Sequence, residues 1–198
     1  ASGSAGGVTN TNKGSLFRRV SVLSVYGHAI VTNQTMTLIE CEASSLGSGA
    51  SFRSSPGSAA GVTFIRCMAH DSVGTSGVGF DLVNGYQTLI QCIADKNGGS
   101  GIKYAGANSL NVIACDSFDN GADGISFAPS AGASLYVENS NFATNVVYGI
   151  NVTGAASNTI LRNNGFGGGS SGNSSGQVSS AIAPTANLGP ITYGGQPY

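Results

Sequence analysis

The feature that most constrains this chain is an internal repeat of about two dozen residues. Two apolar residues, one further residue and a cysteine recur four times, and successive cysteines lie 26, 25 and 23 residues apart. The phrase continues at Tyr136–Asn139 and Ile160–Asn163 and has a weaker first copy at Phe17–Val20. The cysteines are Cys41, Cys67, Cys92 and Cys115. A fixed period of this length indicates a solenoid, here of about seven coils.

A second phrase recurs between the copies of the first. Each copy is a short run around an apolar or aromatic residue, bounded by Gly, Ser or Asn, which is typical of a strand between turns. Sustained helical periodicity is absent from the sequence. The apolar residues of this phrase are Ile30, Phe52, Phe80, Ile102, Ile125 and Ile150. We therefore predict an all-β fold, a single-stranded parallel β-helix.

The alternation of side chains along each strand predicts which residues point inward. The apolar residues of the second phrase should stack as one ladder. The first phrase predicts another inward ladder, formed by Phe17, Leu38, Phe64, Leu89, Val112, Tyr136 and Ile160. Copies of the second phrase are preceded by Gly79, Gly101, Gly124 and Gly149. These glycines indicate positive φ or a close backbone approach.

The repeated phrases resemble those of the right-handed parallel β-helix superfamily, the pectate-lyase-like solenoids. Coils of that family carry an apolar-x-x-Asn phrase whose Asn stacks as an inward ladder at a bend between strands. The resemblance covers about residues 15–166. It implies that Asn139 and Asn163 point inward and that the four cysteines replace Asn in the earlier coils. Lyases, epimerases, phage tailspikes and fibre proteins share the fold, so the resemblance implies architecture without deciding activity.

The ends of the chain differ from its centre. We assign residues 1–14 to an N-terminal arm, 15–166 to the β-helix and 167–198 to a Gly/Ser-rich, Pro-containing tail. The start of the sequence lacks the features of a signal peptide, which fits a processed chain or a fragment. Neither end shows an amphipathic capping helix, so the open strand edges predict contact with the tail or with another copy of the chain.

Charge and hydropathy exclude two classes of partner. Only 9% of residues are charged, the net charge is −1, and the eight Lys and Arg are scattered. Nucleic-acid binding needs clustered basic residues, so we expect no nucleic-acid partner. The longest apolar runs fall well short of the roughly 20 residues that cross a bilayer, so we expect no membrane span.

The cysteines allow more than one state. Residues one coil apart lie about 4.8 Å apart at Cα, within the range of a disulfide. Side chains in a ladder point the same way, which favours stacked buried thiols over bonded pairs. One or two disulfides remain the alternative, and metal binding is the third and weakest one.

An acidic patch is the candidate site. Asp71, Asp95 and Asp119 follow three of the cysteines by three or four residues, so they should neighbour one another, with His70 beside them. Such a patch could bind Ca²⁺ or supply an acid and a base for glycan cleavage. Otherwise, these aspartates terminate strands in turns, as Asp commonly does. With these roles open, no catalytic residue and no metal ligand is assigned.

The resemblance implies what a lyase site would need: Ca²⁺-binding aspartates with an Arg or Lys base on one strand face. Arg53 and Lys103 are predicted to stand alone on outward positions. Arg66 is expected to form a surface ion pair with Glu40 on the preceding coil. His28 is predicted to be a turn residue without a charged neighbour.

Three Asn-x-Ser/Thr sequons begin at Asn33, Asn151 and Asn173. They would accept glycans in a secreted protein of suitable origin. In a chain this rich in Asn, Ser and Thr, chance matches are also expected.

The sequence favours a non-catalytic structural β-solenoid: a self-associating subunit of an extracellular filament, surface fibre or virion appendage. The alternative is a polysaccharide-binding or polysaccharide-degrading module of tailspike, lyase or epimerase type, with a glycan partner. We expect no cofactor, and Ca²⁺ is the one weaker alternative. The expected location is outside the cell or on a cell or virion surface.

Overall fold

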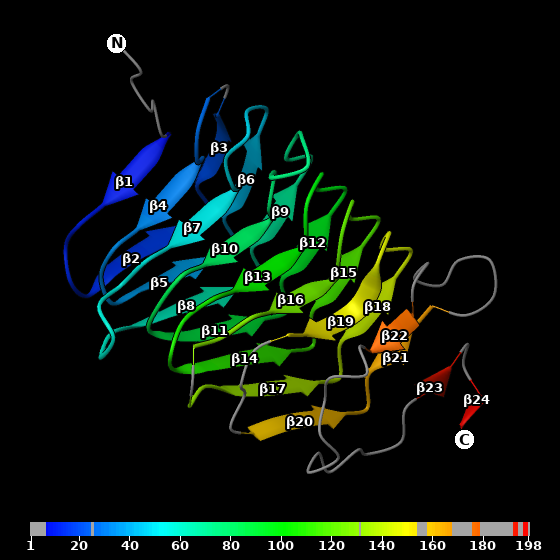
Figure 1. The fold of residues 1–198 in the computed structure, drawn as a ribbon. Coiled ribbons are helices and arrows are strands. Elements are labelled where there is room, and N and C mark those ends of the chain that lie inside the picture. Colours follow the sequence, from blue (N-terminus) through cyan, green and yellow to red (C-terminus); the bar gives the residue numbers. More distant parts are fainter. Residues whose placement is uncertain are drawn as a thin grey trace.

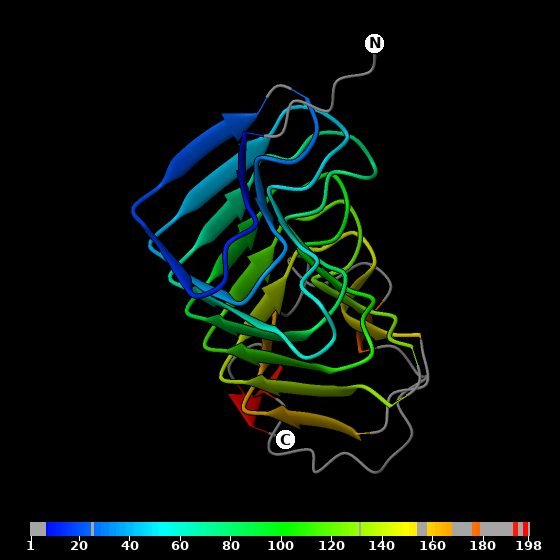
Figure 2. The same cartoon turned by 90° about the vertical axis from the view of Figure 1, so that its left-hand side faces the viewer.

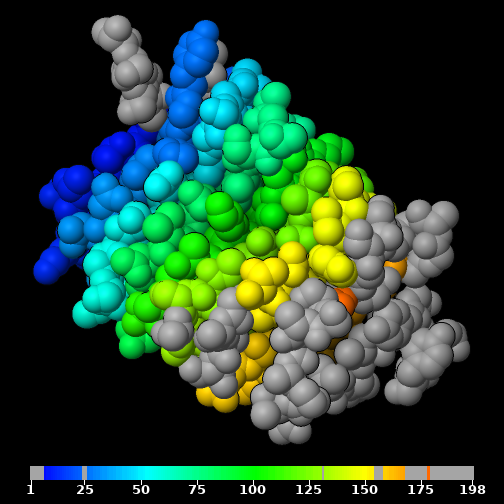
Figure 3. Space-filling view, in the orientation of Figure 1, coloured from blue at the N-terminus to red at the C-terminus, as the bar shows by residue number. Residues whose placement is uncertain are grey.

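The computed structural model describes residues 7–24, 26–130, 132–153, 158–167, 176–178, 192–193 and 196–197. The chain winds through three sheets, with one strand in each sheet per coil, and forms a three-sided rod (Figures 1 and 2). Successive coils lie as adjacent bands along the surface (Figure 3). The predicted all-β parallel β-helix is confirmed. One of the three sheets has seven strands, which agrees with the prediction of about seven coils.

Up to β22 each sheet collects every third strand, and β23 and β24 then join sheet C. Sheet A contains β1 (Val8–Asn10), β4 (Ile30–Thr32), β7 (Phe52–Ser54), β10 (Phe80–Leu82), β13 (Ile102–Tyr104), β16 (Ile125–Phe127), β19 (Tyr148–Val152) and β22 (Gly176–Val178). Sheet B contains β2 (Ser15–Arg18), β5 (Met36–Ile39), β8 (Gly61–Ile65), β11 (Tyr86–Ile90), β14 (Ser109–Ile113), β17 (Ser134–Glu138) and β20 (Asn158–Arg162). Sheet C contains β3 (Ser21–Ser24), β6 (Glu42–Ser45), β9 (Met68–His70), β12 (Ile93–Asp95), β15 (Asp116–Phe118), β18 (Asn141–Ala143), β21 (Gly165–Phe166), β23 (Thr192–Tyr193) and β24 (Gln196–Pro197). All pairs are parallel except β23 with β24.

Both predicted end segments contribute strands to the sheets. Residues 8–10 of the predicted arm form β1, which pairs with β4 and so starts the solenoid before Ser15. From the predicted tail, β22 extends sheet A by pairing with β19, and β23 extends sheet C by pairing with β21. In the described part of the chain, no helix is long and apolar enough to span a membrane.

The inward ladder of sheet A forms as predicted and fills the core. All six of its predicted residues are at most 1% exposed. Phe52 and Phe80 stack with ring centroids 4.9 Å apart, and Phe64 from sheet B meets both rings edge-on. Tyr104 and Phe127 form a second stack at 5.3 Å. Stacking along the axis therefore buries apolar surface that one coil could not bury alone.

Close packing explains the glycines that precede these strands. None of Gly79, Gly101, Gly124 and Gly149 has positive φ. A β-carbon added to Gly79 would lie 2.5 Å from the carbonyl oxygen of Gly101, and one added to Gly124 would lie 2.5 Å from that of Gly149. The backbones of consecutive coils meet here, so the predicted close approach is confirmed and positive φ is not the cause.

The bend from sheet B to sheet C, which we call the first bend, holds the cysteine ladder. Its four cysteines are each 1% exposed and carry free thiols. In every coil a residue with φ between 50° and 56° precedes the inward residue. This left-handed residue turns the chain between the two sheets.

The predicted inward positions of Asn139 and Asn163 are wrong by one residue. Both side chains are exposed. Ser140 and Asn164, each 2% exposed, occupy the inward position and continue the ladder of Cys115. The backbone NH of Cys115 donates to Ser140 Oγ over 3.0 Å, and that of Ser140 donates to Asn164 Oδ1 over 3.0 Å. Asn139 and Asn163 are instead the left-handed residues, a conformation that Asn tolerates.

The same slip affects sheet B, because a shift of one residue exchanges the two faces of a strand. Val137 and Leu161 point inward, where Tyr136 and Ile160 were predicted. Tyr136 lies on the outer face, where its hydroxyl donates to Glu138. A phenol hydroxyl needs a polar partner, and the outer face supplies one.

One more inward ladder, made of asparagines, was not predicted. It lies at the second bend, after the strands of sheet C, and contains Asn97, Asn120 and Asn145. Asn120 Oδ1 accepts from the backbone and side-chain NH groups of Asn97, and Asn145 Oδ1 accepts from those of Asn120. Spacings of 23 and 25 residues were the available signal. The asparagine ladder expected from the resemblance therefore exists, at a different bend.

Candidate functional site

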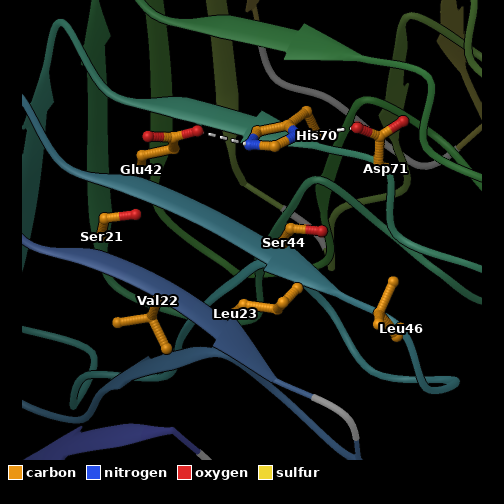
Figure 4. A pocket seen from close by; sticks show the side chains of 8 residues that line it. All are labelled: Ser21, Val22, Leu23, Glu42, Ser44, Leu46, His70 and Asp71. Atoms are coloured by element: carbon orange, nitrogen blue, oxygen red, sulfur yellow. Dashed lines mark hydrogen bonds and ion pairs between the residues drawn. The ribbon is translucent and has the colours of Figure 1, made fainter.

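A groove of about 500 Å³ lies on the outer side of sheet C near the N-terminal end. Its apolar side chains include Leu23 and Leu46, which are 65% and 48% exposed. Glu42, His70 and Asp71 form its polar edge (Figure 4). The groove is lined by Ser21, Val22, Leu23, Glu42, Ser44, Leu46, His70 and Asp71. Two of the predicted site residues, His70 and Asp71, therefore border a hollow.

His70 lies between two carboxylates. Its Nε2 is 2.9 Å from Glu42 Oε1, on the neighbouring strand β6, and its Nδ1 is 2.9 Å from Asp71 Oδ2. Partial burial lowers the pKa of His70, but the hydrogen bonds to Asp71 and Glu42 outweigh burial and raise the pKa above its ordinary value of 6.5. Two acceptors on one imidazole fit the protonated ring, which has two donors and no free base. His70 thus joins Glu42 and Asp71, and the link is an ion pair when its ring is protonated.

The predicted cluster of three aspartates is divided by the register. Asp71, Lys96 and Asp119 occupy the same left-handed position on successive coils, so Lys96 lies between the two acids. Asp95 comes one residue earlier, at the end of β12, in register with His70. The prediction that the three aspartates are direct neighbours is therefore wrong.

Asp95 is the most buried of these acids, at 8% exposed. Its Oδ2 lies 3.2 Å from Lys96 Nζ. A lysine ammonium among these carboxylates disfavours a cation, and no group of three or more His, Cys, Asp or Glu in the described residues could hold a metal ion. The residues present do not fit the Ca²⁺ that was considered for this patch.

A second charged group lies on sheet A. Arg53, Asp81 and Lys103 are in register at the centres of β7, β10 and β13, and Arg53 Nη1 is 3.6 Å from Asp81 Oδ2. Arg53 Nη1 also lies 2.9 Å from His28 Nε2, while His28 Nδ1 accepts from the backbone NH of Ala50 over 2.8 Å. Burial and the positive charge of Arg53 lower the pKa of His28. The predictions that Arg53 stands alone and that His28 lacks a charged neighbour are wrong. Lys103 is in register with Asp81 but forms no ion pair with another residue in the part of the chain that the structure describes.

The predicted ion pair of Arg66 with Glu40 is confirmed at 2.8 Å. Arg19 Nε, on the coil before, donates to the other Glu40 oxygen over 2.8 Å. This hydrogen bond from Arg19 is the main cause of the lowered pKa of Glu40. One carboxylate therefore joins three consecutive coils.

Two of the three sequons lie in the described part of the chain. Asn33 follows β4 in a turn, and Asn151 lies in β19, where its amide donates to Asp123 Oδ2 over 3.0 Å. Asn173 lies outside the described residues. Glycosylation stays a prediction at all three.

The comparisons with known proteins agree with this architecture. A family model described as a right-handed beta helix region matches residues 6–166. The chain belongs to the right-handed β-helix family. Neither the curated proteins nor the solved structures include a match. The fold is compatible with a structural or a polysaccharide-related module and does not decide between them.

Proposed function

We propose that this chain is a non-catalytic structural β-solenoid that associates with copies of itself in an extracellular filament, surface fibre or virion appendage. The supporting observation is that its charged side chains join consecutive coils. Glu40 binds arginines from the coils on both sides, His70 binds Glu42, and Arg53 approaches Asp81. Groups used this way stabilise a rod, whereas a catalytic acid or base must be free to exchange a proton with substrate.

Electron microscopy of the purified, untreated protein tests this proposal. Seven coils give a rod of roughly 30–35 Å, from the strand spacing of about 4.8 Å. We expect regular filaments whose axial repeat is one or two rod lengths. Isolated single chains at high concentration, by microscopy and light scattering, would overturn it.

The groove on sheet C supports a second candidate, a polysaccharide-binding or polysaccharide-degrading module. Exposed leucines beside the hydroxyls of Ser21 and Ser44 and a charged edge suit a sugar, which has apolar C–H faces and polar hydroxyls. Glycan-array binding and ultraviolet-absorbing products from uronate polymers are the measurements. Loss of either signal in His70→Gln, with His28→Gln unaffected, would support this candidate. An absence of binding and turnover across acidic and neutral glycans would remove it.

A further inference from the structure

The outer face of sheet B carries an apolar column that the core does not use. Ile39, Ile65, Ile90 and Ile113 are in register on four consecutive strands. They point away from the core and remain partly exposed. Their neighbours within each strand point inward, and the next outward residues are Thr37, Thr63, Thr88 and Asn111, so the outer face pairs one apolar column with one polar column. A continuous column of isoleucines on the outer face of a parallel sheet is expected where that part of the face is covered.

Charges of opposite sign flank the four isoleucines. Arg18 precedes Ile39 in the register, and Glu138 follows Ile113. From β2 to β17 the column therefore reads basic, four times isoleucine, acidic, and Arg162 of β20 follows Glu138 outside this six-strand part. Such a sequence of side chains is complementary to itself when its direction is reversed.

We propose that two copies of the chain pack face to face through the outer faces of sheet B, with their coil orders opposed. This rests on the proposed function and names the lateral contact between its subunits. A two-fold axis parallel to the strands, between β8 and β11, makes the contact isologous. Ile65 then lies opposite Ile90 of the second copy, and Ile39 lies opposite its Ile113. Arg18 lies opposite Glu138 at both ends.

The charges favour this orientation over the other two-fold arrangement. With equal coil order, Arg18 would meet Arg18 and Glu138 would meet Glu138, and like charges across an interface disfavour that pairing. The left-handed residues of the first bend form the neighbouring column. With opposed coil order, like charges do not meet in this column either. There Glu40 lies opposite Ala114, and Arg66 lies opposite Gln91.

The edge of the face where β8 and β11 begin offers an aromatic anchor. Tyr86 is 52% exposed, and the register places it beside Gly61 on the preceding coil. The proposed axis brings Tyr86 of each copy opposite Gly61 of the other, where the missing side chain leaves room for the ring. Tyrosines that become buried in an interface often carry much of its affinity.

The size of the face is sufficient for a specific contact. Six strands at about 4.8 Å, each about five residues of roughly 3.3 Å, cover roughly 500 Å² per copy. The total of roughly 1,000 Å² lies at the lower limit for a specific interface, so we expect a concentration-dependent dimer.

Charge reversal with rescue tests the contact, read by sedimentation equilibrium of the full chain over a concentration series. The wild-type mass should rise from 19.7 kDa toward twice that value. Arg18→Glu and Glu138→Arg should each raise the dissociation constant about tenfold, since each breaks two symmetric pairs. The double variant should return to within about threefold of wild type. The two sites are five coils, about 24 Å, apart in one chain, so rescue must act between copies.

Lys103→Glu, an equal charge reversal on sheet A, is the matched control and should leave the dissociation constant unchanged. Circular dichroism confirms that each variant is folded. A double variant no tighter than the single ones would overturn the inference, and so would a wild-type monomer at every concentration, whose face would then be left to another partner. Filaments that persist unchanged in both single variants would overturn the inference and leave the proposed function standing. A dimer that the double variant rescues but that never forms filaments would support the inference and overturn the proposed function.

Discussion

The first and second bends, two of the three bends in each coil, solve the same geometric problem with different chemistry. At the first bend a left-handed residue is followed by an inward cysteine in four coils, then by Ser140 and Asn164. At the second bend a left-handed residue is followed by Ser72 and then by inward asparagines in three coils. The backbone turn is equivalent, but one ladder is mainly a stack of thiols and the other is a chain of amides.

The difference shows which ladder can tolerate change. Cys92 Sγ lies 3.4 Å from the carbonyl oxygen of Phe64 and 3.5 Å from that of Ile90, and both are weak hydrogen bonds. Burial raises the pKa of the Cys92 thiol, which therefore stays protonated and packs as a small apolar group. An amide ladder instead links each coil to its neighbours through strong donors and acceptors, so removing one member leaves the others unsatisfied.

The largest effect should come from Asn120→Ala. Asn120 donates to Asn145 Oδ1 and to the carbonyl oxygen of Ala94, and it accepts two hydrogen bonds from Asn97. Its loss leaves several buried polar groups without partners, so we expect the free energy of unfolding to fall by about 3–5 kcal/mol. Urea denaturation measures this, and the exposed Asn141→Ala should change stability by less than about 0.5 kcal/mol. Equal effects of the two variants would remove the amide ladder as a source of stability.

Cys92→Ala should cost less at the equivalent central place of the other ladder. The change removes one buried sulfur and no strong hydrogen bond, so we expect a loss of about 1–2 kcal/mol. The same urea experiment compares it directly with Asn120→Ala. A loss as large as that of Asn120→Ala would show that the thiol stack is not the more tolerant ladder.

The sequence predicted the fold because the cysteine phrase keeps its spacing and its apolar pair over four coils. It failed where the cysteines stop. Asn139 matched the expected ladder residue at a spacing of 24, although the inward residue is Ser140, at 25. The alternation of Leu135 and Val137, which repeats that of Leu110 and Val112, carried the correct register. The prediction therefore followed Asn139 and not the alternation of apolar residues along the strand.

The candidate site was less predictable, because the loops differ in length from coil to coil. The Arg66–Glu40 pair was found because both residues follow the apolar pair of their coils. The contact of His28 with Arg53 was missed, since the spacing from Ile30 to Phe52 is 22 residues and from Phe52 to Phe80 it is 28. Turn residues therefore have no fixed partner on the next coil. The same variation hid the position of Lys96 between Asp71 and Asp119.

Replacing the left-handed residues by glycine should change stability by a smaller amount, and by different amounts at the two bends. Ala114 has φ 52° at the first bend, and Thr144 has φ 54° at the second. Glycine relieves this conformation, but it also adds freedom to the unfolded chain, so we expect Ala114→Gly to stabilise by about 0.5–1 kcal/mol. Thr144→Gly should gain less, because Thr144 Oγ1 accepts from the backbone NH of Asp119. Thermal unfolding measures both, and a destabilised Ala114→Gly would contradict the assigned role of the left-handed residue.

The smallest effect concerns the two histidines, one beside the second bend and one before sheet A. The raised pKa of His70 means that its contribution to stability is complete below pH 6.5 and is lost as pH rises through the folded-state value. The lowered pKa of His28 gives the opposite dependence, complete above pH 6.5 and lost as pH falls through its folded-state value. NMR titration should place the two imidazoles on opposite sides of 6.5, with His70→Gln assigning the signals. If both imidazoles titrate on the same side of 6.5, either the carboxylate pair around His70 or the burial of His28 beside Arg53 does not persist in solution. The difference between the two histidine sites would then disappear.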